Sequence, residues 1–225
     1  MPQVQSLTRS LVGQKILMAL TGVVLLLFVI GHMIGNLKVF LGPEHFNAYA
    51  EGLRTVGAPF FGRGQVLWLV RLVLIVAVGL HIWSALVVTM ASWRARPVGY
   101  RTLALVETTF AARTIRLLAI CFFLYIVFHL LDLTFGRTNP AFVPGDAYHN
   151  LVASFQRFPV ALVYEIAMVI LGLHLYHGIW SACQTLGFNH PRYNAYRRGA
   201  ALLIAVVTSV GFAVVPLAVQ AGIVR

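Results

Sequence analysis

Charged residues are scarce in this chain. Only 10% of its 225 residues are Asp, Glu, Lys or Arg, whereas 60% are hydrophobic and the mean hydropathy is +0.84. A soluble domain carries roughly a quarter charged residues. The scarcity therefore argues against a soluble protein and predicts an integral membrane protein.

Cysteine and several catalytic motifs are also lacking. The two cysteines, Cys121 and Cys183, lie in apolar stretches and form no C-x-x-C pair, so neither a zinc site nor an iron–sulfur cluster is expected. The H-E-x-x-H motif of zinc proteases is absent. The first apolar stretch is long and lacks an A-x-A site, so we expect no cleaved signal peptide. An iron–sulfur cluster that exchanges electrons with this protein must belong to another chain.

Long apolar runs dominate what is present. A helix needs about 20 apolar residues to cross about 30 Å of hydrocarbon. Five stretches qualify, near residues 15–40, 66–93, 114–136, 159–186 and 199–221. We expect residues 1–225 to form one all-α domain, an integral membrane bundle of five transmembrane helices. The fifth stretch contains Pro216 and no histidine, so the first four are expected to form the functional core.

Basic residues are distributed unevenly between the two ends of these spans. Ten of the seventeen Lys and Arg lie on the N-terminal side: Arg9, Lys15, Arg94, Arg96, Arg101, Arg113, Arg116, Arg192, Arg197 and Arg198. Cytoplasmic loops are enriched in basic residues, so the N-terminus is predicted to be cytoplasmic. The net charge of +11 does not indicate nucleic-acid binding, because the basic residues lie in separate short loops.

Histidine is the most informative residue type. Four of the apolar stretches carry histidine deep inside, namely His32, His81, His129 and the pair His174/His177. An ionisable side chain inside a membrane costs a few kcal/mol and usually faces the bundle interior at a functional site. One such residue can simply hydrogen-bond to a neighbouring helix, but one on each of four helices favours a shared role. Imidazole is a common axial ligand of haem iron, and facing helices of bundles hold such cofactors.

The depths of the histidines suggest two pairs. His32 lies six residues before Lys38 and His129 eight before Arg137, so both are near the outer surface. His81 and His174 lie farther from the basic residues that precede their spans, and so deeper. Helices one and three are thus expected to hold one group, and helices two and four another. Two histidines leave no open position on a haem iron, so each site would carry electrons.

A short sequence pattern that occurs in two spans distinguishes His174 from His177. His174 follows Gly-Leu, as His81 does, and Trp-Ser-Ala follows both. This pattern favours His174, and His177 remains the alternative ligand.

Six motifs resemble one family of membrane proteins. They are SLVGQKILMALTG (residues 10–22), HMIGNL (32–37), FNAYAEGLR (46–54), GLHIWSA (79–85), RARPVGY (94–100) and GLHLYHGIWSACQ (172–184). In this order they resemble the cytochrome b membrane-anchor subunit of succinate:quinone oxidoreductase, in its single-chain, five-helix, dihaem form related to fumarate reductase anchors. The motifs extend over nearly the whole chain.

The resemblance implies two b haems, with His32 and His129 as ligands of the outer one and His81 and His174 of the inner one. It implies a flavoprotein that oxidises succinate and an iron–sulfur subunit, both on the cytoplasmic side of the plasma membrane. This chain would relay their electrons to a quinone, with menaquinone expected. One departure is that Gly172 stands where related fumarate reductases have a glutamate; Glu165 is the only carboxylate inside this span. The proton mechanism of those enzymes is therefore not carried over.

Candidates for quinone binding lie at both ends of the spans. A quinone needs an apolar slot with polar groups for its carbonyls. Near the outer haem the candidates are His45, Asn47, Tyr49 and Glu51, and near the inner face they are Ser10, Lys15 and Arg94. Residues 45–51 could equally form an interfacial helix with Tyr49 at the headgroup level.

Three further charged residues have candidate roles. Arg113 and Arg116 could bind haem propionates or carboxylates of a partner protein. Asp132 could pair with Arg137 or serve a proton path. The rival readings of the whole chain are a proton-coupled transporter with a histidine relay and a membrane anchor without haem.

Overall fold

The computed structural model describes residues 10–95 and 110–225, with the backbone alone at residues 110–113. All regular elements in this part are helices. Five of them are long and apolar enough to cross a membrane: Leu11–Leu41, Gln65–Arg94, Thr114–Thr134, Phe158–Thr185 and Pro191–Gln220. The predicted all-α fold with five apolar spans is confirmed, and the fifth span begins earlier than expected.

Short helices connect the long ones. The order is α1 (Leu11–Leu37), the 3-10 turn η2 (Lys38–Leu41), α2 (Pro43–Thr55), α3 (Gln65–Arg94), α4 (Phe110–His129), the π-helical turn η3 (Leu130–Thr134), α5 (Ala147–Phe155), α6 (Phe158–Thr185), the 3-10 turn η4 (Pro191–Tyr193) and α7 (Asn194–Gln220).

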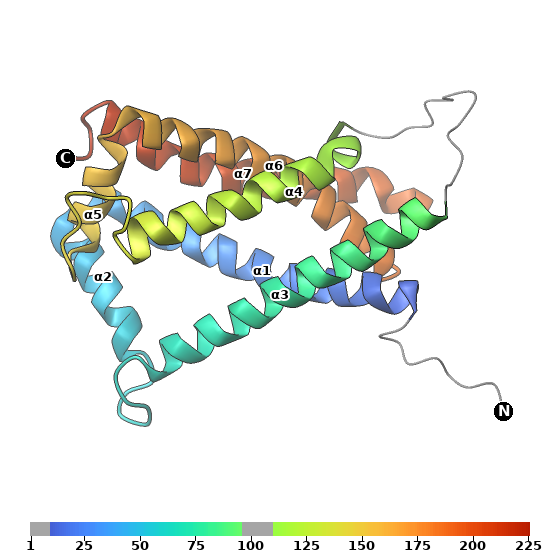
Figure 1. Ribbon diagram of the computed structural model, residues 1–225, viewed down its shortest axis with the longest axis horizontal. Coiled ribbons are helices and arrows are strands. Elements are labelled where there is room, and N and C mark those ends of the chain that lie inside the picture. The colour runs from blue at the N-terminus through green and yellow to red at the C-terminus, as the bar shows by residue number, and fades with distance from the viewer. Residues whose placement is uncertain (1–9, 96–109) are drawn as a thin grey trace.

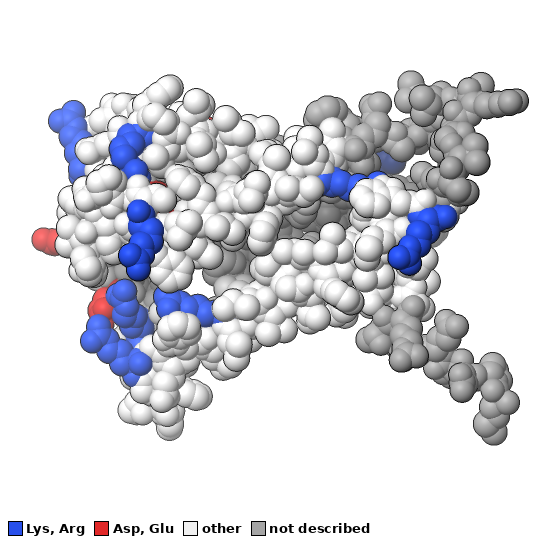
Figure 2. Space-filling model, in the orientation of Figure 1, with Lys and Arg blue, Asp and Glu red and all other residues white. Residues whose placement is uncertain are grey.

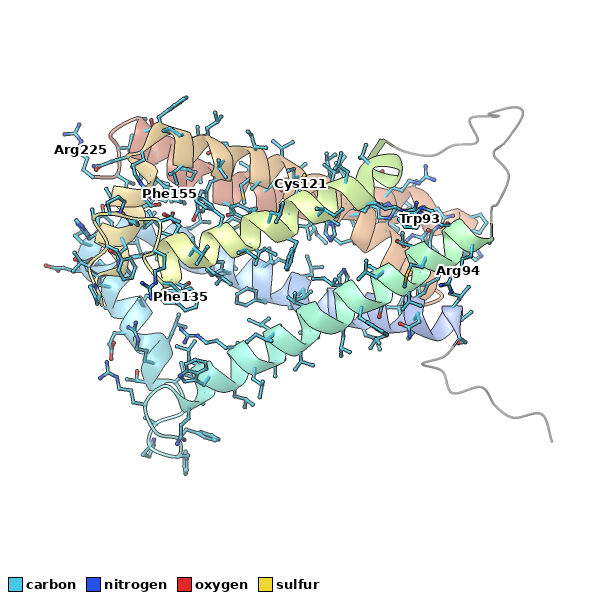
Figure 3. All side chains as sticks on the ribbon, in the orientation of Figure 1. Trp93, Arg94, Cys121, Phe135, Phe155 and Arg225 are labelled. Atoms are coloured by element: carbon cyan, nitrogen blue, oxygen red, sulfur yellow. The ribbon has the colours of Figure 1, made fainter. Side chains whose placement is uncertain are left out.

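The long helices run between two distinct ends (Figure 1). One end, which we call the α2/α5 end, holds both short helices and the C-terminus, at the left of the view. The other, which we call the N-terminal end, holds the start of α1, the last turns of α3 and the start of α7. Trp93 and Arg94 lie at the N-terminal end, whereas Phe135, Phe155 and Arg225 lie at the α2/α5 end (Figure 3). The chain thus crosses between the same two ends five times.

Local sequence explains where several helices begin. The hydroxyl of Ser10 accepts a hydrogen bond from the Gly13 N–H at 3.0 Å, and so caps α1. Gly42 has φ +92°, a conformation that glycine adopts without strain, and Pro43 then starts α2. Asp146 caps α5 by accepting from the His149 N–H at 2.9 Å.

Helices α1, α6 and α7 form the centre of the bundle. Helix α7 packs on α6 and α1, α4 packs on α6, and α3 packs mainly on α1. Small side chains such as Ala201 and Ala205, 0% and 2% exposed, allow the central helices to approach closely. In the view of Figure 1, α3 diverges from α4 and α6 toward the α2/α5 end.

Apolar side chains cover the outside of the spans. Large exposed hydrophobic residues occur along all five, as expected for helices that face lipid. Lys and Arg are concentrated near the two ends, and the visible acidic residues lie at the α2/α5 end (Figure 2). The charge distribution agrees with the multi-pass membrane character of the chain.

Candidate functional site

The fold brings His32 of α1 and His129 of α4 together. Their ring centroids are 6.0 Å apart, with the rings at 80° to each other. His129 ends α4 and His32 lies five residues before the end of α1, so this pair, which we call the outer pair after its predicted position, lies near the α2/α5 end. Phe28 stacks on His32 at 5.4 Å. This contact joins the first and third spans, which the sequence predicted to hold one group.

A second pair joins His81 of α3 and His174 of α6. Their ring centroids are 6.3 Å apart, and the rings lie at 60° to each other. Both residues are near the middle of their helices, so this inner pair is deeper than the outer one. Phe122 stacks on His174 at 6.0 Å. Two helices without extensive mutual packing thus contribute to one cluster.

Hydrogen bonds fix the orientation of His81. Its Nδ1 lies 3.0 Å from the Met18 carbonyl and 3.2 Å from the Thr21 hydroxyl. The Thr21 hydroxyl donates to the Leu17 carbonyl at 2.8 Å, so both groups facing Nδ1 act as acceptors. The proton of a neutral imidazole must therefore be on Nδ1, which leaves the lone pair of Nε2 available to a metal.

His129 has a comparable contact. Its Nδ1 lies 3.3 Å from the Tyr164 hydroxyl, which is itself 3.2 Å from Asp132. On His174, by contrast, the buried Nδ1 has no hydrogen-bond partner among the described residues. Among the described residues, no protein partner thus fixes the Nδ1 proton of His174, in contrast to that of His81.

The spacing of both pairs fits a shared metal. Two imidazoles on opposite sides of one metal atom, each with a nitrogen about 2 Å from it, have ring centres roughly 6 Å apart. The observed 6.0 and 6.3 Å are compatible with this spacing and also lie in the range of ordinary aromatic ring contacts. No cluster of three or more His, Cys, Asp or Glu suited to a metal ion occurs in the part of the chain that is described. Haem needs only two protein ligands, because the porphyrin supplies the other four.

His177 is half-buried one turn after His174. The ring contact with His81 is made by His174. The geometry therefore favours His174, as the repeated sequence pattern does.

The outer quinone candidates lie on α2, and two of them have protein partners. The Asn47 amide donates to Asp146 at 2.9 Å and accepts from the Tyr148 N–H at 2.9 Å, so it ties α2 to α5. Glu51 forms ion pairs with Arg54 at 3.1 Å and Arg63 at 2.6 Å.

The other two outer candidates differ in exposure. His45 is exposed at the surface. Tyr49 lies against α1, where a Cβ on Gly35 would come within 2.5 Å of its hydroxyl, and Lys38 lies 5.2 Å from the centre of its ring. Residues 45–51 lie within the helix α2.

The capping carboxylate of α5 is held in its charged form. The His149 N–H and the Asn47 amide both donate to Asp146, and these bonds lower the pKa of its carboxyl below the ordinary value. Asn47 and Asp146 thus stabilise the α2/α5 end together.

The inner candidates lie near the N-terminal end. Ser10 caps α1, whereas Lys15 and Arg94 are exposed. Arg116 lies 5.5 Å from the centre of the Trp93 ring and 3.4 Å from the Ser92 hydroxyl, so it joins α4 to the end of α3. The side chain of Arg113 lies outside the described residues.

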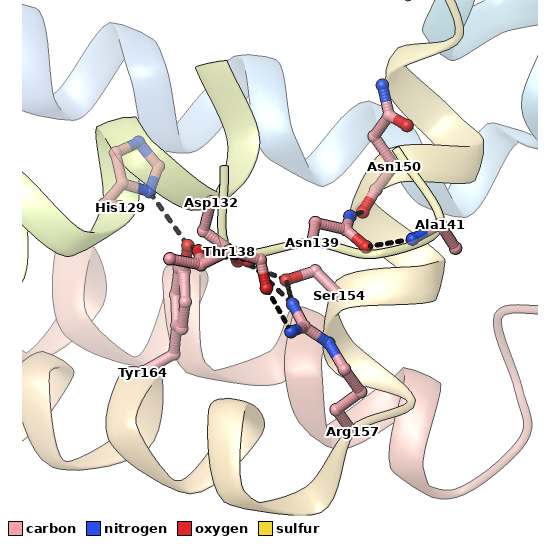
Figure 4. Close-up of polar contacts among 9 residues, drawn as sticks. All are labelled: His129, Asp132, Thr138, Asn139, Ala141, Asn150, Ser154, Arg157 and Tyr164. Carbon is pink, nitrogen blue, oxygen red and sulfur yellow. Dashed lines mark hydrogen bonds and ion pairs between the residues drawn. The ribbon is translucent and has the colours of Figure 1, made fainter. Parts of the chain in front are cut away.

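A buried polar network beside the outer pair was not foreseen (Figure 4). Asp132 forms its ion pair with Arg157 at 2.7 Å, so the expected pairing with Arg137 is wrong. The Asp132 carboxylate also accepts from Thr138 at 3.1 Å and from Ser154. Thr21 and Tyr164, which contact the histidine rings, were likewise missed, because neither residue type signals such a role in a sequence.

Comparison with protein-family models, with curated proteins and with solved structures finds no match to this chain.

Proposed function

We propose that this chain is the membrane cytochrome b subunit of a succinate:quinone oxidoreductase. The observation that carries the proposal is the presence of two histidine pairs at 6.0 and 6.3 Å, each built from two different spans and each at its own depth. The resemblance of the six sequence motifs to that family supports the same proposal.

In this proposal His32 and His129 hold one b haem and His81 and His174 the other. Haem supplies one-electron redox chemistry when it is bound. The protein fixes the imidazoles: the Met18 carbonyl and the Thr21 hydroxyl hold the Nδ1 proton of His81, and Phe122 and Phe28 pack against the rings of His174 and His32. The two depths make a path for electrons along the bundle.

The proposed partners are a flavoprotein and an iron–sulfur subunit at the N-terminal end. Exposed basic residues there, including Lys15, Arg94 and Arg116, suit an acidic protein surface. By the distribution of basic residues this end is proposed to face the cytoplasm, with the chain in the plasma membrane.

Electrons would pass to a quinone, with menaquinone proposed. At the α2/α5 end, Asn47 and Glu51 are engaged by protein partners, which leaves His45 and Tyr49 as the candidates there. At the N-terminal end, Lys15 and Arg94 have exposed charged groups.

A spectrum of the purified chain tests the proposal. We expect reduced-minus-oxidised spectra and pyridine haemochrome assay to give two b haems per chain, and succinate to reduce them in membranes that contain all three subunits. A chain that binds no haem would overturn the proposal and leave an anchor or a histidine-relay transporter.

A further inference from the structure

Asp132 is the centre of a buried polar cluster. Its carboxylate is 0% exposed and sits on the π-helical turn that follows His129. Arg157 and Thr138 donate to Oδ1 at 2.7 and 3.1 Å, and Ser154 and Tyr164 donate to Oδ2. Four donors fill the acceptor capacity of the carboxylate, whereas the buried Nε of Arg157 has no hydrogen-bond partner among the described residues.

The network determines what the Tyr164 hydroxyl can offer to His129. A hydroxyl has one proton, and the carboxylate of Asp132, 3.2 Å away, is the stronger acceptor. The Tyr164 oxygen must then accept at its 3.3 Å contact with the Nδ1 of His129. The chain of bonds therefore runs from the imidazole N–H through the phenol to a carboxylate; Figure 4 shows the three residues and the contact between His129 and Tyr164.

The two histidine pairs differ in this respect. His81 donates its Nδ1 proton to neutral acceptors, the Met18 carbonyl and the Thr21 hydroxyl. His129 donates to the Tyr164 hydroxyl, which in turn donates to the Asp132 carboxylate. A hydrogen bond of this kind makes an imidazole a more basic ligand, which favours the oxidised iron.

We propose that Tyr164 is a positioning residue that fixes the Nδ1 proton of His129 and, with Asp132 behind it, lowers the reduction potential of the outer haem. This inference rests on the proposed function, because it needs a haem between His32 and His129. Tyr164 touches neither haem nor quinone in this account and acts through the ligand.

The test is potentiometry of both haems in the whole protein, with Tyr164→Phe as the variant. Phe keeps the ring that packs against Phe155 at 4.7 Å and Tyr125 at 5.2 Å, and removes only the hydroxyl. We expect both haems to remain bound and the outer one to become easier to reduce by about tenfold, or about 59 mV for one electron. The inner haem should keep its potential.

Tyr125→Phe is the matched control. Tyr125 contacts the His129 ring at 6.0 Å, but the hydroxyl within hydrogen-bonding distance of Nδ1 is that of Tyr164. This control should leave both potentials unchanged. Asp132→Asn, which removes the charge and retains the shape, should shift the outer potential in the same direction as Tyr164→Phe.

The outcomes separate this inference from the proposed function. Two bound haems with an unchanged outer potential in Tyr164→Phe would overturn the role of Tyr164 and leave the proposed function standing. Equal shifts in Tyr164→Phe and Tyr125→Phe would also overturn it, because ring packing would then be the cause. A wild-type chain without haem would overturn both.

Discussion

Asp132 is a charged residue placed where no water reaches it. Taking a carboxylate out of water is costly, and its partner Arg157 must compensate the charge. The side chain of Arg157 is 30% exposed, so its positive charge lies between the buried carboxylate and the surface of the α2/α5 end. The same guanidinium also donates to the Thr138 carbonyl at 2.6 Å and so holds the loop after α4. One ion pair thus supports both the fold of this end and the hydroxyl beside His129.

Replacing Arg157 with leucine tests this dependence. Arg157→Leu leaves the buried charge of Asp132 without its partner, so we expect it to lower the free energy of unfolding by about 3 kcal/mol. The exposed Arg137, which lies much closer to Asp132 in the sequence, is the control, and Arg137→Leu should change stability by less than about 0.5 kcal/mol. Unfolding in mixed detergent micelles measures both. Equal losses would show that Asp132 does not depend on Arg157.

The partner of Asp132 illustrates what the sequence could not provide. Arg137 is five residues away in the chain and was the natural choice, whereas Arg157 is twenty-five residues away at the start of α6. Asp132 lies in the π-helical turn Leu130–Thr134, in which the Phe135 N–H donates to the Leu130 carbonyl at 2.9 Å. The direction of its side chain, and so its partner, depends on this turn. Hydropathy predicts that a helix is present, but it does not predict where that helix changes its winding.

At the scale of elements, the α2/α5 end is held by caps and by bonds between short helices. Asp146 caps α5 and accepts from Asn47 of α2, and the Tyr148 hydroxyl donates to the carbonyl of Arg225 at 3.0 Å. These contacts hold the termini of the long helices in place beside the outer histidine pair. An interfacial helix over residues 45–51 was one of two interpretations of the sequence, whereas the bridge from Asn47 to α5 joins residues 99 positions apart and could not be foreseen.

The cap of α5 has a predictable dependence on pH. Removing it in Asp146→Ala should cost about 1 kcal/mol of stability, whereas Asp146→Asn, which keeps an accepting oxygen, should cost much less. Because the folded protein lowers the pKa of Asp146, its charge stabilises the fold above about pH 4, and this contribution is lost as the pH falls through the lowered pKa. Unfolding followed from pH 7 down into the acid range below pH 4 should show this loss in wild type and not in Asp146→Asn. The same acid sensitivity in the variant would contradict the assignment.

At the scale of the molecule, the spans and the histidine pairs follow from sequence, and their packing does not. Runs of about 20 apolar residues fix where helices cross, and counting along them fixes the relative depth of each histidine. The packing of α3 mainly on α1, and the position of α7 against both α1 and α6, depend on side-chain fit that hydropathy does not encode. The ring centres of His81 on α3 and His174 on α6 nevertheless lie 6.3 Å apart.

The haem content of single histidine variants tests the central claim most directly. We predict two haems per wild-type chain, loss of one and the same haem in His32→Ala and His129→Ala, and loss of the other in His81→Ala and His174→Ala. His177→Ala and the loop variant His190→Ala should keep both. Spectra and pyridine haemochrome assays of the purified chains would show this pairing. Loss of a haem in His177→Ala but not in His174→Ala, or a wild-type chain with no haem, would contradict it.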